Sequence, residues 1–314
     1  KFKTMIGGQA LIEGIMMRGP EKDAIVIRGK DGLTVEVSPR KLNPPGSWKT
    51  WPFIRGVFNF FDAQIVGVKA LLRSADLAPD EMQEEPSKFD KWLEEKLGDN
   101  LMKVLGGVAV VLGVALAAVL FIFIPTGLSS LLKPLLGAGI GLSLFEGLIK
   151  VIILVGYMWL SSRMKEIHRV FEYHGAEHKT IACYEAEEEL TPENAARHSR
   201  LHPRCGTNYL FLVMAVSILF FAAIGWNANF AVRLAMRIAF LPVVAGLSYE
   251  VLRFAARHDN WLTRIIRAPG MALQRITTKE PTPDMLEVAI AAFNLAMDPN
   301  YKVENAAGAA QSAE

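Results

Sequence analysis

The chain has 314 residues, of which 51% are hydrophobic, with a mean hydropathy of +0.25 and a formal net charge of +2 at pH 7. Such an apolar composition argues against an ordinary soluble globular protein. The nearly balanced charge gives no sign of a nucleic-acid partner, and we expect none.

Residues 1–43 predict a small β-rich cap. Its clearest feature is a hairpin, in which the β-branched runs 24–28 and 33–38 flank the turn sequence Gly-Lys-Asp-Gly. Before the hairpin, closely spaced glycines in GGQALIEGIMMRGP indicate a tight turn or a close backbone approach. In that segment Glu13 and Arg18 are candidates for a functional role, with a structural role as the alternative.

Residues 44–103 predict an amphipathic helix followed by a linker. Apolar residues recur at near-helical spacing from Pro52 to Leu72, with charged residues between them. We therefore expect an interfacial helix that lies on the membrane or against the transmembrane bundle. The segment 75–100 is acidic and contains prolines, which favours a solvated linker with a short amphipathic helix near 89–97.

Four later segments are apolar enough to cross a bilayer, and the first has 21 residues without a charge, close to the roughly 20 that a span needs. The expected spans are Val104–Ile124, Leu144–Leu160, Tyr209–Trp226 and Phe230–Leu252. They form two hairpins, 104–161 and 209–252, of a mainly α, polytopic membrane protein. Pro125 and Gly127 should end the first helix, and the connection 128–142 could dip into the outer leaflet.

Ionisable residues inside these spans form pairs at helical spacing. Glu146 and Lys150 are four residues apart in the second span, and Arg233 and Arg237 are four apart in the fourth. A charge at the centre of a span costs about 2.5–3.5 kcal/mol on insertion scales, which makes such groups functional candidates. We interpret the four as a salt-bridged set that holds the spans together, and a transporter is the alternative that they suggest.

The distribution of Lys and Arg predicts the orientation in the membrane. Residues 1–103 carry 16 of them, 162–208 carry seven and 253–314 carry seven, whereas the two remaining connections carry one. Because positive loops stay in the cytoplasm, both termini and the 162–208 segment are expected on that side of the inner cell membrane. No signal sequence opens the chain, so we expect targeting through the internal spans.

The region after the fourth span, 253–314, should contain two helices and a tail. Leu252 to Ala268 is basic and amphipathic, which fits a helix at the inner interface. A second helix is expected at 283–297, started by Thr-Pro-Asp, and the Ala-rich end from Asn305 is expected to be disordered.

The strongest chemical signal lies within the predicted cytoplasmic segment 162–208, in the stretch 171–206, which holds four of the six histidines and both cysteines. His174 to His178 spells H-x-x-E-H, which on a helix places two imidazoles one turn apart with a glutamate beside them. We expect the second span to continue as a helix over Ser161–Ala186. A second helix from Thr191 to His202 would bring another histidine pair to face the first.

This pattern predicts a divalent metal site, with zinc as the expected ion. His174 and His178 would be ligands and Glu177 the base that takes a proton from water, as in zinc hydrolases. The remaining ligand is open among His198, His202, Cys205 and Glu250, and a structural site closed by His202 and Cys205 is the alternative to a catalytic one. In the reducing cytosol the two cysteines favour metal ligation or free thiols over a disulfide.

Other interpretations of the same histidines remain open. One alternative is that they are only hydrogen-bonding groups of a polar cap. Another is a membrane scaffold or assembly factor that binds a membrane-protein partner or forms a homo-oligomer. A di-iron membrane desaturase also uses H-x-x-x-H boxes, but it needs more histidines than the six present here.

Six blocks carry a resemblance to a known family. They are GGQALIEGIMMRGP at 7–20, PFIRGV at 52–57, EYHGAEHKTI at 172–181, HPRCGT at 202–207, SYEVLRFA at 248–255 and PTPDMLEVAIAA at 281–292. The chain resembles the YqhQ-type bacterial integral membrane proteins, which are described as predicted metal-dependent enzymes. The resemblance implies a metal and an enzyme but no substrate, and it makes Cys183 a weaker candidate ligand than Cys205.

Overall fold

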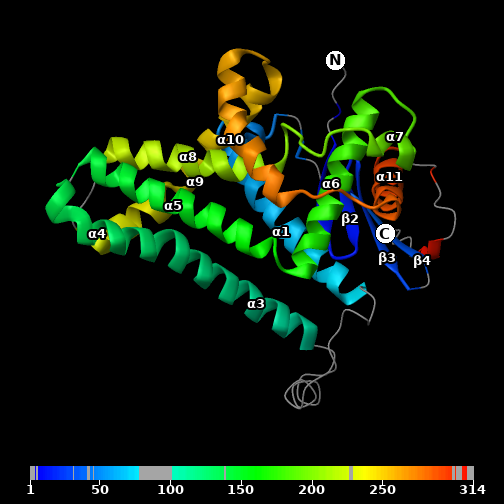
Figure 1. The fold of residues 1–314 in the computed structure, drawn as a ribbon, viewed down its shortest axis with the longest axis horizontal. Coiled ribbons are helices and arrows are strands. Elements are labelled where there is room, and N and C mark those ends of the chain that lie inside the picture. The colour runs from blue at the N-terminus through cyan, green and yellow to red at the C-terminus, as the bar shows by residue number, and fades with distance from the viewer. Residues whose placement is uncertain are drawn as a thin grey trace. The chain divides into compact units, whose positions relative to one another are not determined.

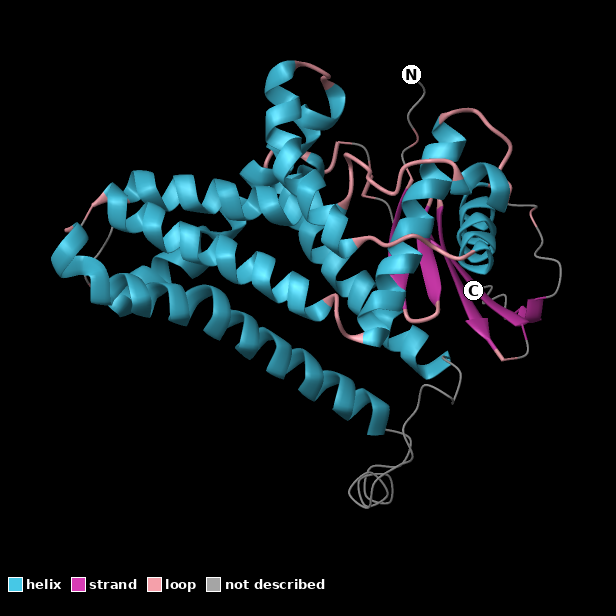
Figure 2. Ribbon diagram, in the orientation of Figure 1, coloured by secondary structure: helices cyan, strands magenta, loops and turns pink. Residues whose placement is uncertain are grey.

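The structure is a computed structural model that describes residues 4, 6–30, 32–40, 43–44, 46–77, 101–137, 139–225, 229–298, 301 and 306–309. The chain forms two compact units, one from 1–78, 155–216 and 241–314 and the other from 79–154 and 217–240 (Figure 1). The first, here called the sheet unit, contains the β-sheet, and the second, here called the span unit, is helical (Figure 2). The linker predicted over 75–100 lies outside the described residues beyond Leu77.

The strands are β1 (Gly7–Leu11), β2 (Gly14–Arg18), β3 (Lys22–Gly29), β4 (Gly32–Pro39) and β5 (Ala306–Ala309), in that order across one sheet. β1 to β4 are antiparallel and confirm the predicted β-rich N-terminal region, with Gly29 paired to Gly32 at the end of the expected hairpin. β5 runs parallel to β4. The prediction of disorder from Asn305 was therefore wrong for 306–309, where small residues add to the edge that β4 leaves open.

The described helices are η1 (Trp48–Thr50), α1 (Ile54–Leu77), α3 (Leu101–Ala118), η4 (Val119–Phe123), α4 (Ile124–Leu136), α5 (Ile140–Ser161), α6 (Lys165–Glu185), α7 (Pro192–Ala196), α8 (Gly206–Ile224), α9 (Phe230–Arg257), α10 (Trp261–Thr277) and α11 (Pro283–Met297). α11 has the bounds that the sequence predicted.

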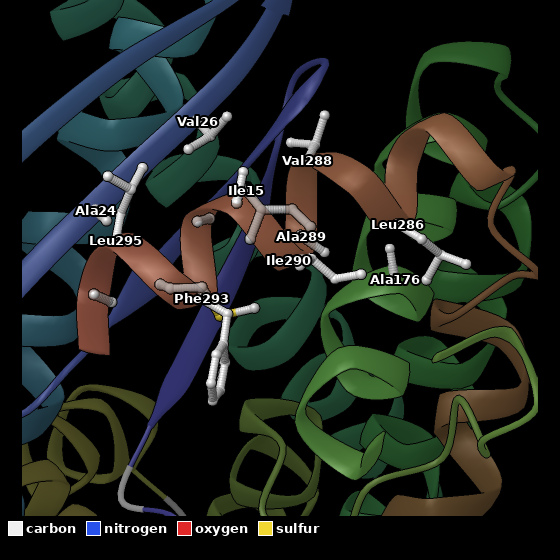
Figure 3. Packing of buried hydrophobic residues seen from close by; sticks show 14 of the residues in the cluster. Ile15, Ala24, Val26, Ala176, Leu286, Val288, Ala289, Ile290, Phe293 and Leu295 are labelled. Carbon is white, nitrogen blue, oxygen red and sulfur yellow. The ribbon is translucent and has the colours of Figure 1, made fainter. Parts of the chain in front are cut away.

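The core of the sheet unit forms because alternate residues of each strand point to opposite faces of the sheet. Ile15 and Val26 join one hydrophobic cluster with residues of α6 and α11, among them Phe293 (Figure 3). Met16 lies on the other face and packs against Ala70 of α1. The sheet is thus covered by α6 and α11 on one face and by α1 on the other.

Helix α1 corresponds to the interfacial helix predicted over 52–72. Its buried face consists of small residues, Gly56, Gly67, Ala70 and Ser74. Its large apolar residues Phe61 and Ile65 are about half exposed, at 49% and 55%. The small residues allow close packing on the protein, and the exposed apolar ones suit a bilayer or its interface.

Among the described residues, four helices are long and apolar enough to span a membrane, as predicted: Val104–Leu135, Ile140–Ser161, Gly206–Ile224 and Ala231–Arg257. The first continues past the expected end at Pro125. η4 is a π-helical turn directly before this proline, and it contains Phe121, whose carbonyl a proline ring would otherwise crowd. The part 128–136 of the connection expected over 128–142 is consequently helical in α4.

Two other predicted helices are interrupted. α5 ends at Ser161 and α6 begins at Lys165, and between them the Ser162 hydroxyl donates to the Trp159 carbonyl, a local bond that competes with helix continuation. The basic helix expected over 252–268 is divided at 258–260, where Asn260 and Thr263 form a capping box that starts α10.

The helix predicted from Thr191 to His202 was also wrong in length. Thr191 caps the Asn194 N–H as expected, but α7 ends at Ala196. The Lys179 ammonium donates to the carbonyls of Ala196 and His198 at 2.8 and 2.9 Å. In a longer helix these carbonyls would accept hydrogen bonds from later backbone N–H groups. Because they accept from Lys179 instead, the helix ends and the chain turns.

The ionisable residues predicted to form a set in the span unit lie close to polar partners. Glu146, only 2% exposed, forms ion pairs with Lys150 at 3.2 Å and with Arg237, and it accepts a hydrogen bond from Thr126 at 3.3 Å. Arg233 donates to the Ser130 hydroxyl at 3.2 Å. The interpretation as an ionic set between spans therefore holds for Glu146, Lys150 and Arg237.

Candidate metal centre

Helix α6 presents His174 and His178 on one face because they are one turn apart, and their ring centroids are 4.4 Å from each other. The last residue of α10 orients His174, whose Nδ1 lies 2.8 Å from the Thr277 carbonyl. Gly175 allows this approach: a Cβ there would lie 2.0 Å from the Lys279 carbonyl oxygen. The glycine inside the motif is thus required by packing.

Cys205 reaches the two imidazoles from the start of α8. Its Sγ lies 3.1 Å from His174 Nε2 and accepts a hydrogen bond from the Thr207 N–H at 3.4 Å. The loop before it is held by Gln274 of α10, whose side chain bonds both the N–H and the carbonyl of His202 at 2.8 Å. The cysteine is therefore positioned by tertiary contacts.

The ligand atoms of His174, His178 and Cys205 all lie within 4.8 Å of one another. His178 Nδ1 lies 2.6 Å from the Arg200 carbonyl, which makes this nitrogen the donor, and its buried Nε2 has no hydrogen-bond partner in the described part of the chain. Burial lowers the pKa of His178, which favours the neutral ring. Histidine ligands of metals usually donate their other N–H to a carbonyl, so these residues fit a divalent metal.

Glu177 lies on the same helix between the two histidines and is 5% exposed. One carboxylate oxygen accepts a hydrogen bond from the Gly8 N–H of β1 at 2.9 Å. Burial raises the pKa of Glu177, against the opposite effects of His174 and of the Gly8 N–H. A Cβ at position 8 would lie 2.8 Å from the Glu177 carboxyl carbon, so glycine permits this contact.

A cavity of about 390 Å³ adjoins these groups within the sheet unit. Its lining includes His174, Glu177, His178 and Cys205 together with Gly7–Ala10 of β1. A volume of this size lies in the range of small-molecule sites. His178 and Cys205 are thus buried and His174 is partly buried, but all three adjoin open space.

The other candidate ligands lie outside this group of three. His202 has its ring centroid 5.6 Å from that of His178, and its Nε2 lies 3.7 Å from Glu185. His198 pairs with Glu188 at 3.2 Å, and these two form a separate group with Cys183.

Glu250 and the two candidates in β1–β2 are held in ion pairs. Glu250 is bound by the Arg55 guanidinium at 2.5 and 2.8 Å. Glu13 accepts two bonds of 2.5 Å from Arg169, and Arg18 pairs with Asp23 and Asp62 at 3.3 and 2.9 Å. These contacts favour structural roles, and for Glu13 the role is to tie the β1–β2 turn to α6.

The sequence interpretation missed the Gly8 N–H as a partner of Glu177, and it missed the carbonyls that orient the two imidazoles. The glycine-rich opening of the chain did indicate a close backbone approach. The glycine-rich segment could not indicate which residue approaches its backbone, because Glu177 is 169 positions away from Gly8.

The four candidate spans and the buried His/Cys/Glu group define a polytopic membrane protein with a candidate metal centre. Residues 51–299 match the family described as "Protein of unknown function (DUF1385)", and the chain belongs to this family. It is 35% identical over 302 residues to "Uncharacterized protein YqhQ" of Bacillus subtilis (strain 168), a match that covers 94% of this chain and 92% of the relative. The YqhQ-type resemblance is therefore confirmed. No solved structure matches the chain.

Proposed function

We propose that this protein is a divalent-metal-dependent hydrolase, with zinc as its ion, that acts at the cytoplasmic face of the inner membrane. The observation that carries the proposal is the convergence of His174, His178 and Cys205, whose ligand atoms lie within 4.8 Å of one another. The His178 Nε2 is buried and has no hydrogen-bond partner among the described residues. The orientation rests on the excess of Lys and Arg in the termini and in 162–208.

The donor set favours zinc, because imidazole nitrogen and thiolate sulfur are its usual ligands. Three protein ligands leave one tetrahedral position for water or substrate, which is the arrangement of catalytic sites. A zinc ion held there would supply a Lewis acid that polarises a carbonyl and makes water more acidic. The cavity beside the cluster gives a substrate access to that position.

Glu177 is proposed as the proton carrier. Its carboxylate lines the same cavity, and in the free protein its contact with the Gly8 N–H fixes its direction. It would accept a proton from water as the water oxygen attacks the substrate, and then deliver that proton to the leaving group. His202 lines the cavity as well, and its contact with Glu185 suits a role in shaping the site.

A second candidate function is a membrane scaffold with a structural metal. The burial of His178 and Cys205, 1% and 8% exposed, favours it, since closed structural sites are shielded from water.

Metal analysis of the detergent-purified protein tests both functions. We expect about one zinc per chain in the wild type, and a loss of metal in His174→Ala and Cys205→Ser. The matched controls His198→Ala and Glu250→Gln should keep it. A metal-free wild type, or full metal content in His174→Ala, would overturn the proposal.

Glu177→Gln separates the two functions. The hydrolase predicts that this variant keeps its metal and loses metal-dependent turnover on a panel of fluorogenic esters, amides and peptides. The scaffold predicts that its metal and its cellular function are both intact.

A further inference from the structure

Strand β1 is the edge of the sheet beside the candidate metal centre. It is hydrogen-bonded to β2 on one side and to no strand of the described chain on the other. The residues Gly7–Ala10 line the cavity that also contains Glu177 and the three candidate ligands. An unpaired strand edge is a template for an added strand.

The hydrogen bond from Gly8 to Glu177 shows which backbone groups face outward. In an antiparallel pair, residues alternate between those bonded to the partner strand and those whose N–H and carbonyl point away from it. Since the Gly8 N–H leaves the sheet to reach Glu177, Gly8 and Ala10 are the outward-facing residues of β1.

Side chains of the protein already cap most of this edge. Ile6 N–H donates to the Thr4 hydroxyl, Gly8 N–H to Glu177, and Ile12 N–H to the Ser74 hydroxyl, at 3.2, 2.9 and 3.2 Å. Within the described residues Ala10 has no cap of this kind. The stretch from Gly8 to Ala10 is thus the part of the edge that faces the cavity and can accept a ligand.

We propose that an extended polypeptide segment binds along Gly8–Ala10 as an added strand, and that a carbonyl of this segment replaces the Glu177 carboxylate on the Gly8 N–H. Glu177 then occupies, in the free protein, the place of a substrate carbonyl, and binding releases its carboxylate next to the carbonyl carbon to be attacked. The cleavage step rests on the proposed hydrolase, whereas strand addition does not.

The balance of the cleavage step is that of amide hydrolysis. Water oxygen bonds to the carbonyl carbon, the C–N bond breaks, and the proton taken by Glu177 goes to the leaving nitrogen. The Gly8 N–H donates to the carbonyl oxygen, where negative charge develops.

The chemistry of this edge favours a peptide over a lipid ester. Ala10 offers both an N–H and a carbonyl, and a peptide backbone supplies both complements, whereas an ester has no N–H to give. The cavity walls near β1 carry small or apolar side chains, Ile6, Ala63, Val170 and Ile181, with Gln64. Apolar residues on either side of the bound carbonyl are therefore expected.

The first test measures binding without metal. Chelator-treated protein is titrated with a fluorescein-labelled nonapeptide, Lys-Ser-Val-Ala-Val-Ala-Val-Ser-Lys, and with two versions N-methylated on alternate residues of its centre. Because alternate N–H groups point to opposite edges of a strand, one version should bind about tenfold more weakly and the other should match the parent. Hydrogen exchange at residues 8–10 should slow when peptide is bound. Equal binding by both methylated peptides, or unchanged exchange, would overturn the proposal.

Variants of Ala10 test the same edge from the protein side. Ala10→Pro removes the outward N–H and should weaken binding about tenfold. Ala10→Ser keeps the N–H and should weaken binding clearly less than Ala10→Pro. If Ala10→Pro does not fold, the methylated peptides still decide, since they use the unaltered protein.

Failure of this inference and of the proposed function can be distinguished. Peptide binding by a protein that holds no metal would leave strand addition standing and remove the hydrolase. Metal-dependent ester hydrolysis without peptide binding would keep the hydrolase and remove the peptide.

Discussion

Both units of the chain bury polar groups, but they do so in opposite ways. In the span unit the Glu146 carboxylate faces the ammonium of Lys150 and the guanidinium of Arg237, so opposite charges meet. In the sheet unit two imidazole nitrogens and a sulfur converge, all of them atoms that can donate electron pairs to a metal. The charged members of the first group pair with one another, whereas the second group offers lone pairs that a cation or a proton would bind.

The difference separates a structural polar cluster from a functional one. An ionisable group in a membrane span is a functional candidate by default, yet the partners of Glu146 account for its burial. The histidines carry no formal charge when neutral and cost less to bury. Both imidazoles have their Nδ1 atoms turned to backbone carbonyls, which orients the two rings alike. Helix packing alone does not explain this shared orientation, whereas metal ligation does.

The largest expected effect comes from removing the negative charge of Glu146 in the span unit. Glu146→Gln keeps the size of the side chain but leaves Lys150 and Arg237 without their counter-charge, so we expect a loss of about 3–5 kcal/mol in unfolding free energy. Thermal or denaturant unfolding in detergent measures this. Metal content should stay at the wild-type level in the protein that remains folded.

The matched control is Asp259→Asn, which removes the exposed ion pairs of Asp259 with Arg264 and Arg267, at 3.2 and 3.1 Å. Exposed pairs contribute little, so a change below about 1 kcal/mol is expected. Equal stability losses in the two variants would mean that Glu146 is not the structural centre of the span unit.

A smaller effect is expected from Gly175→Ala in the sheet unit. The added methyl group would collide with the backbone oxygen of Lys279, which cannot rotate away as a side chain can. We expect a loss of about 1–3 kcal/mol and a fall in bound metal, because the Thr277 carbonyl that orients His174 belongs to the displaced segment. Differential scanning fluorimetry and metal analysis of the same sample measure both quantities.

Gly156→Ala is the control, since nothing lies within 4 Å of the Cβ that it would add. This change should leave metal content unaltered. Retention of full metal and stability by Gly175→Ala would contradict the close approach of the 277–279 segment to α6.

The membrane spans and α11 could be predicted because their signals are local. A run of apolar residues defines a span wherever it lies, and Thr-Pro-Asp before an apolar run is sufficient to start a helix. The length of α7 was mispredicted because a distant side chain decided the outcome. α7 is short because Lys179 takes its terminal carbonyls, and this contact has no local signature.

The residues of the candidate site also fall into those that local sequence spacing places and those that the fold places. The H-x-x-E-H spacing brings His174, Glu177 and His178 together through helix geometry alone. Choosing among the later candidates needed the fold, because His202 and Cys205 follow a loop whose path depends on Gln274, 72 positions from His202. Sequence spacing was therefore informative up to the length of one helix.

The smallest expected effect is a pH dependence at the rim of the candidate site. Burial raises the pKa of Glu185, but hydrogen bonds from His202, Arg204 and the Thr4 N–H outweigh it and hold the pKa at about 2. The folded-state pKa is thus below the value of about 4.3 for a free glutamate. Its contribution to stability is present above that value and is lost as the pH falls toward 2.

Unfolding measured between pH 5 and pH 2 should therefore show a loss of about 1–2 kcal/mol from this group, a range reduced to allow for screening by solvent. Glu185→Gln cannot ionise, so it should be less stable than the wild type at pH 6 and should approach it at pH 2. The matched variant Glu188→Gln changes a more exposed carboxylate, 46% exposed against 18% for Glu185, and should leave the acid slope unchanged. A wild-type slope in Glu185→Gln would show that the carboxylate does not hold Arg204 and the 202–205 loop in place, and the metal centre would then depend on Gln274 for the position of Cys205.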